Sequence, residues 1–151
     1  MRTRVGRTQK WLQVGVGLIM AGTLGACAIS VEGARQSPEA TVTGFYAWYD
    51  DFEGSPLGSR AYRESDYLST DFVRRLDALV DSFANGGGAF DPFICAQDGP
   101  PEIEIIEVEE VAERARVTVQ AWAPIYVDVA LEGSEWQITD IHCTPPQMPI
   151  E

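Results

Sequence analysis

The sequence predicts a single α+β domain, in which helices come first and a meander of antiparallel strands follows. Two patterns support this fold class. Apolar residues recur at helical spacing between residues 37 and 84, and they alternate with polar residues from 103 to 143. The chain has 151 residues, of which 45% are hydrophobic and 23% charged. This composition suits one domain with a core and indicates neither disorder nor a fibrous repeat.

The amino terminus has the pattern of a bacterial lipoprotein signal. Basic residues within the first ten positions precede an uncharged apolar run from 14 to 26. These 13 residues are fewer than the ~20 of a membrane-spanning helix and match a signal peptide. The run leads into Leu-Gly-Ala-Cys, which resembles the lipobox. We therefore expect a signal peptide over 1–26, a diacylated Cys27 and a lipidated tether over 27–36, anchored at the outer membrane or the outer face of the cell membrane.

The charge balance excludes one class of partner. The predicted signal contains four of the 11 basic residues and none of the 23 acidic residues. The exported chain would therefore keep seven basic residues, all arginines, and carry a net charge of −16. Such a surface repels the phosphates of nucleic acid, which is therefore not expected as a partner. It also disfavours a second contact with anionic lipid, which leaves the lipid on Cys27 as the expected membrane anchor.

The first predicted helix begins with Ser37 as its N-cap and Pro38 at the first helical position. Glu-Gly-Ser-Pro at 53–56 ends it. Its apolar stripe consists of Val42, Phe45, Tyr49 and Phe52, flanked by Tyr46 and Trp48. Tyr46, Trp48 and the strand residue Trp122 lie off the apolar faces, so they form either a second packed face or an exposed patch for a partner.

Two further helices are expected before the strands. The first is one short helix, formed by the polar stretch that starts at residue 57 and contains Tyr62 and Tyr67. The second begins after a Ser69 or Thr70 cap and ends at Asn-Gly-Gly-Gly over 85–88. One face of this second helix carries Phe72, Leu76, Leu79, Val80 and Phe83.

Strands are predicted over 103–111, 115–123, 125–131 and 136–143 from their period-two patterns. The first strand changes phase at Ile106, which predicts a bulge. The turn at 132–135 predicts a hairpin between the last two strands.

The segment Asp-Pro-Phe-Ile-Cys-Ala-Gln-Asp-Gly-Pro-Pro at 91–101 joins the helices to the strands and holds the candidate site residues. In the favoured interpretation it is a structural clamp. Asp91, Gln97 and Asp98 would then bond backbone amides at turns, and Phe93 would fill the core.

The alternative for this segment is a catalytic or binding site. A buried Asp91 or Asp98 near Tyr49 would have a raised pKa and act as a base on a small ligand. Asp50 and His142 are further candidate acids or bases. We expect no catalytic residue, because the clamp explains the same residues with fewer requirements.

Cys95 and Cys143 are predicted to form a disulfide, because an exported chain meets oxidising conditions. The competing uses of these cysteines have little support. One histidine in the whole chain offers little for a zinc site. His142 is the neighbour of Cys143, but adjacent residues on a strand point to opposite faces, which disfavours a thiol–imidazole pair.

Other site types have little support in the sequence, and neither a metal nor another cofactor is expected. There is no Gly-x-Ser-x-Gly motif, and the glycines at 86–88 are not followed by the lysine of a phosphate loop. Residues 91–99 also lack the alternating acids of a calcium loop.

Three motifs resemble a bacterial family known as domain of unknown function 3828. They are Phe-Tyr-Ala-Trp-Tyr at 45–49, Tyr-Leu-Ser-Thr-Asp-Phe at 67–72 and Asp-Pro-Phe…Ala-Gln-Asp at 91–98. The resemblance extends over residues 40–142. It implies a cone-shaped nuclear-transport-factor-2-like, or cystatin-like, fold, in which helices pack on a curved antiparallel sheet. It also implies a secreted or lipid-anchored protein, and it carries no established activity.

The sequence thus predicts a lipid-anchored envelope protein with one domain over 37–144 and a tail over 145–151. Its expected role is to bind an envelope protein or a small ligand without catalysis. The alternative is an isomerase, dehydratase or hydrolase that uses a carboxylate in the pocket of the cone.

Overall fold

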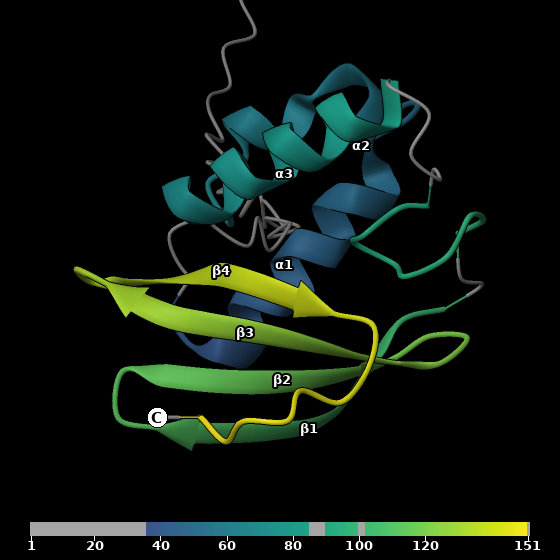
Figure 1. Ribbon diagram of the computed structural model, residues 1–151. Coiled ribbons are helices and arrows are strands. Elements are labelled where there is room, and N and C mark those ends of the chain that lie inside the picture. Colours follow the sequence, from purple (N-terminus) through teal and green to yellow (C-terminus); the bar gives the residue numbers. More distant parts are fainter. Residues whose placement is uncertain (1–35, 85–89, 100–101, 151) are drawn as a thin grey trace, which may run out of the picture.

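The computed structural model describes residues 36–84, 90–99 and 102–150, which form one α+β domain (Figure 1). Helices α1 (Pro38–Asp51), α2 (Pro56–Ser59) and α3 (Thr70–Ala84), with the 3₁₀ helix η2 (Ala61–Glu64), precede the strands. The strands are β1 (Glu104–Val111), β2 (Arg114–Gln120), β3 (Pro124–Glu132) and β4 (Glu135–His142). Four predicted features lie outside the described residues: the signal, Cys27, all but the last residue of the tether, and the Asn-Gly-Gly-Gly segment at 85–88.

The predicted starts of the two longer helices are confirmed. Ser37 caps α1, since its Oγ accepts a hydrogen bond from the amide of Ala40 at 3.1 Å. Ser69 takes the same role before α3, where its Oγ accepts from the amide of Phe72 at 3.3 Å. These bonds satisfy amides that have no partner within the helix.

The prediction of one short helix between α1 and α3 was wrong. Two short helices, α2 and η2, are separated by Arg60, whose backbone is left-handed with φ 61°. Ser55 caps the first of them, and the left-handed residue ends it after one turn. The hydroxyl of Tyr62 in η2 donates to Asp77 of α3 at 2.6 Å. Burial and this contact raise the pKa of Tyr62 to about 12.

The four strands form an antiparallel sheet in the order β1-β2-β3-β4. The register between β1 and β2 shifts between Ile105 and Glu107, which confirms the predicted bulge. A second shift lies between Asp128 and Val129, where β3 pairs with β4. The hairpin predicted before Trp136 is present, with Gly133 at φ 71° in its turn.

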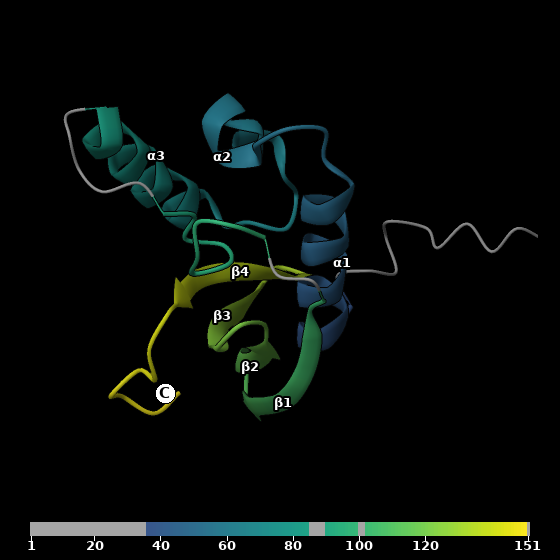
Figure 2. The same cartoon turned by 90° about the vertical axis from the view of Figure 1, so that its right-hand side faces the viewer.

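The core lies between the sheet and the helices. Helix α1 contacts all four strands, and α3 contacts β4 (Figure 1). The buried strand residues facing them are Ala115, Val117, Val119, Ile125, Val127, Val129, Trp136 and Ile138. Figure 2 shows the C-terminal segment on the opposite face of the sheet from α1. Of the helices described, none is long and apolar enough to cross a membrane.

The two edges of the sheet differ. Beside β4, residues Tyr67 to Ser69 act as a short parallel partner. The amide of Ile138 donates to the carbonyl of Tyr67 at 2.8 Å, and the amide of Ser69 donates to the carbonyl of Ile138 at 3.0 Å. Strand β1, at the other edge, pairs only with β2 among the described residues. Its side chains are almost all exposed.

Candidate functional site

Asp91 is held at the start of a tight turn. Its amide donates to the carbonyl of Ala96 at 2.9 Å. One carboxylate oxygen, Oδ1, accepts from the amide of Phe93 at 2.9 Å, and the other, Oδ2, accepts from the hydroxyl of Tyr49 at 3.1 Å. Burial raises the pKa of Asp91, although both hydrogen bonds favour its ionised form. Oδ1 therefore braces the turn itself, and Oδ2 joins the turn to α1.

Phe93 fills the space between the turn and the helices. Its side chain is fully buried, and its ring lies 5.3 Å from that of Phe45, 6.0 Å from that of Tyr49 and 6.2 Å from that of Tyr62, between centroids. Its carbonyl accepts a hydrogen bond from the hydroxyl of Tyr46 at 2.8 Å. The turn thus contributes one ring to an aromatic cluster built mainly by α1.

The three aromatic residues outside the predicted stripes have different surroundings. Tyr46 is buried, and burial is the main reason why the pKa of its hydroxyl is raised. Trp48 is half-buried against the ring of Phe45. Trp122 is exposed in the loop between β2 and β3. They do not form one exposed patch, because Tyr46 is buried and only Trp122 of the three is largely exposed.

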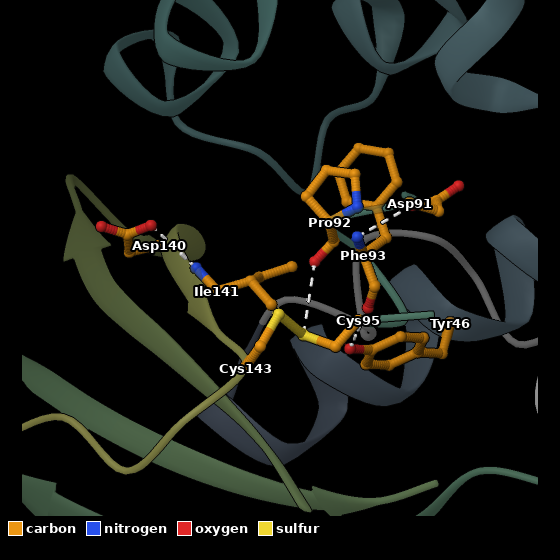
Figure 3. The surroundings of a disulfide bond; sticks show 8 residues. All are labelled: Tyr46, Asp91, Pro92, Phe93, Cys95, Asp140, Ile141 and Cys143. Carbon is orange, nitrogen blue, oxygen red and sulfur yellow. Dashed lines mark hydrogen bonds between the residues drawn. A yellow bond between two sulfur atoms is a disulfide. The ribbon is translucent and has the colours of Figure 1, made fainter. Parts of the chain in front are cut away.

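The predicted disulfide between Cys95 and Cys143 is present, with 5.4 Å between the Cα atoms (Figure 3). It ties the turn to the residue that follows β4. Cys95 has a left-handed backbone with φ 54°. Gln97 and Asp98, the other candidates in this segment, are exposed to solvent.

An open groove of about 630 Å³ lies between α1 and β1, next to the turn. Acidic residues line it, namely Glu39, Asp50, Glu102 and Glu104. Aromatic and aliphatic residues line the rest, namely Tyr46, Ala47, Tyr49, Ile103 and Ile105, together with Thr43 and Gly99. Asp91 is not among the lining residues, although its hydrogen-bond partner Tyr49 is.

A polar cluster on the opposite face of the sheet was not predicted. The Nε and Nη2 atoms of Arg116 donate to the two carboxylate oxygens of Asp128 at 2.7 and 3.0 Å. Nε2 of His142 lies 3.0 Å from Oδ2 of Asp128, and Nη1 of Arg116 donates to the carbonyl of Met148 at 3.2 Å. A second groove, of about 510 Å³, lies between these strands and the C-terminal segment.

The fold brings some of the candidate catalytic residues together and separates others. Tyr49 and Asp50 line the α1–β1 groove, Asp91 is bonded behind it, and His142 lies on the other face of the sheet. Both described cysteines are in the disulfide, so neither is a free thiol. Across the three described stretches, no three His, Cys, Asp or Glu residues are grouped to hold a metal ion.

Similar chains occur among solved structures, whereas no family model and no curated protein matches this chain. A chain of the native type VI effector–immunity complex Tae3–Tai3 from Ralstonia pickettii matches with a TM-score of 0.54 and 26% identity. The match covers 71% of this chain and 94% of that chain. The selenomethionine form of the complex gives a TM-score of 0.50 and 28% identity, covering 70% and 94%. The likeness thus includes nearly all of the neighbour's fold.

The raised pKa of Asp91 leads to a prediction about pH. The folded protein holds the proton of Asp91 to a higher pH than the unfolded chain does. The resulting stabilisation is complete below the unfolded pKa and is lost as the pH rises through the folded pKa. Asp91→Asn keeps an acceptor for the amide of Phe93 but does not titrate. We expect wild type to lose stability relative to Asp91→Asn across this pH range.

Urea unfolding of both proteins at a series of acidic pH values measures this difference. Carbon-13 NMR of the Asp91 carboxyl group gives its pKa directly. A stability difference that stays constant with pH, or that changes in favour of wild type as the pH rises, would contradict the burial of this carboxyl group.

Proposed function

We propose that this chain is an exported, lipid-anchored protein that binds a protein toxin and blocks it, as the immunity component of an effector–immunity pair. The observation that carries the proposal is the likeness to a chain of the Tae3–Tai3 complex. It extends over 94% of that chain at 26% identity, so it supports a shared mode of action as well as a shared fold.

The site geometry favours the immunity role over the effector role. An effector needs an activity of its own, whereas an immunity protein needs only a surface that fits its partner. Asp91 bonds Tyr49, but hydrogen bonds occupy both of its carboxylate oxygens and it does not line the groove, and His142 lies on the opposite face of the sheet. The engagement of both Asp91 oxygens counts against an isomerase, dehydratase or hydrolase that would use this carboxylate.

The proposed location rests on the amino-terminal sequence. The basic start, the apolar run and Cys27 supply export, cleavage and lipid attachment to the cell envelope. The tether then places the domain outside the membrane, where an incoming toxin would act. We also propose that the domain has the cone-shaped fold of the domain of unknown function 3828 family. The motifs that resemble this family lie at 45–49, 67–72 and 91–98.

A competition assay tests this function and does not require the toxin to be identified. The gene is deleted in the native host, and the deletion strain is grown in contact with its parent. We expect the deletion strain to be killed on contact and to survive when a filter separates the strains or when the parent lacks type VI secretion. A plasmid copy of the wild-type gene should restore survival.

Two outcomes would count against parts of the proposal. Equal survival of parent and deletion strain in contact would contradict the immunity role. Full protection by a Cys27→Ser chain, exported by a signal without a lipobox, would leave the immunity role intact and contradict the need for a lipid anchor.

A further inference from the structure

We propose that the partner binds by strand addition: a basic, extended segment of the partner protein pairs with the free edge of β1 and lies along the α1–β1 groove. This inference rests on the proposed function and names the surface and the partner chemistry for it. It depends on three features of β1, which are its unpaired edge, its exposed apolar side chains and its charge.

The edge at β1 is open, whereas the edge at β4 is closed. The backbone of Tyr67 and Ser69 takes up both hydrogen-bonding groups of Ile138 in β4. On the outer side of β1, no paired segment occurs within the described part of the chain. The unpaired amides and carbonyls of an edge strand can bond an added strand, a common mode of peptide recognition.

Strand β1 also exposes apolar side chains that the other strands bury. Ile106, Val108 and Val111 are 52%, 40% and 50% exposed. They are three of the six large hydrophobic residues found exposed in the described residues, and all three lie in one strand of eight residues. The side chains of an added strand would pack beside them, and burial of part of this apolar area would supplement the backbone hydrogen bonds.

The charge of this surface specifies the partner. Strand β1 carries Glu104, Glu107, Glu109 and Glu110, and the groove adds Glu39, Asp50 and Glu102. Among the described residues that line the groove, none is basic. The one arginine directly opposite a β1 glutamate is Arg116, across from Glu109, and its guanidinium already pairs with Asp128. A segment rich in lysine or arginine would therefore complement this edge.

The same charges disfavour a second copy of the chain as occupant. Two β1 strands side by side would bring glutamates together, and like charges opposite one another destabilise strand pairing. Glutamates and a bulge on an edge strand also protect proteins from unwanted association. The glutamates repel acidic strands and favour no neutral one, but their negative charge attracts a basic strand. They are therefore compatible with the proposed partner.

The test uses a charge reversal with a matched control. Glu104→Lys/Glu107→Lys changes two exposed residues of β1, and Glu53→Lys/Glu132→Lys makes the same change in net charge at exposed positions outside β1 and the groove. The probe is a protein that meets two conditions. The tagged wild-type chain retains it from a host lysate, and deletion of its gene from the attacking strain abolishes killing. Affinity is measured at low and high salt, with thermal unfolding as the check on folding.

We expect the β1 reversal to weaken binding by roughly tenfold or more and to reduce protection in the competition assay. The control should keep the affinity and the protection of wild type. Wild-type affinity should fall as salt increases. Amide hydrogen exchange in β1 should slow in the complex, because half of its amides would gain partners from the added strand.

Several outcomes would overturn the inference. One such outcome is that the β1 reversal binds and protects as well as wild type does. Another is that the β1 amides exchange at the same rate in the complex as in the free chain. In either case the partner binds elsewhere, and only this inference fails. A dimer of the free chain that the β1 reversal disrupts would identify a second copy as the occupant. If wild type gives no protection, the proposed function fails as well.

Discussion

Replacing both Cys95 and Cys143 with alanine should lower the free energy of unfolding by roughly 4 kcal/mol. The disulfide joins residues 48 positions apart, and this cross-link restricts the unfolded chain more than a short loop would. Urea unfolding of the exported chain, in the oxidised wild type and in the double variant, measures the loss. Reduction of the wild type by dithiothreitol should give a similar value.

The loss of the disulfide should also affect the groove. Cys95 belongs to the turn that carries Asp91 and Phe93, and Cys143 follows β4, so the bond fixes the turn to the sheet. We therefore expect the double variant to bind its partner less tightly even at temperatures where it stays folded. Unchanged stability in the double variant would contradict a structural role for this bond.

Replacing Phe93 with alanine should cost about 3–5 kcal/mol of stability, the range for a fully buried aromatic side chain. Phe93 has no exposed surface, and its ring contacts those of Phe45, Tyr49 and Tyr62. Its removal would leave a cavity in the centre of the aromatic cluster. Phe90→Ala is a matched control, because Phe90 is three residues away in the chain and 43% exposed.

We expect Phe90→Ala to cost less than about 1 kcal/mol, although its ring is near that of Phe83. Both variants are compared with wild type by urea unfolding under the same conditions. Similar losses from Phe90→Ala and Phe93→Ala would mean that the turn at residues 91–96 is not packed as the structure has it.

Local signals in the sequence were sufficient for much of the fold. Ser37 with Pro38, and Ser69 before the third helix, marked helix starts because caps act within a few residues. The alternation of apolar and polar residues identified the strands, and the phase change at Ile106 located the bulge. The disulfide could be predicted because only two cysteines remain after Cys27.

Other features depend on contacts between distant segments. Arg60 has a left-handed backbone that its residue type does not indicate, so the split between α2 and η2 was missed. Tyr46 is buried because the turn at 91–96 packs over it. The cluster of Arg116, Asp128 and His142 forms only in the observed strand register. The alternation showed that Arg116 faces away from the core, but the pattern gave no partner.

The groove was missed for the same reason. Its acidic residues come from α1 and from the start of β1, more than 50 positions away in the chain. Only the packing of α1 across the sheet brings Glu39 and Asp50 near Glu102 and Glu104. The candidate site predicted from residues 91–98 lies beside this groove, and Tyr49 is the predicted residue that belongs to both.

The most direct test of binding without catalysis is a titration of the partner toxin with this chain. We predict that the toxin's activity falls in proportion to the chain added and is fully lost at a fixed whole-number ratio. Light scattering should then show a complex of that same composition. Complete inactivation by a small fraction of an equivalent, or loss of activity with no complex formed, would contradict a binding protein and indicate an enzyme.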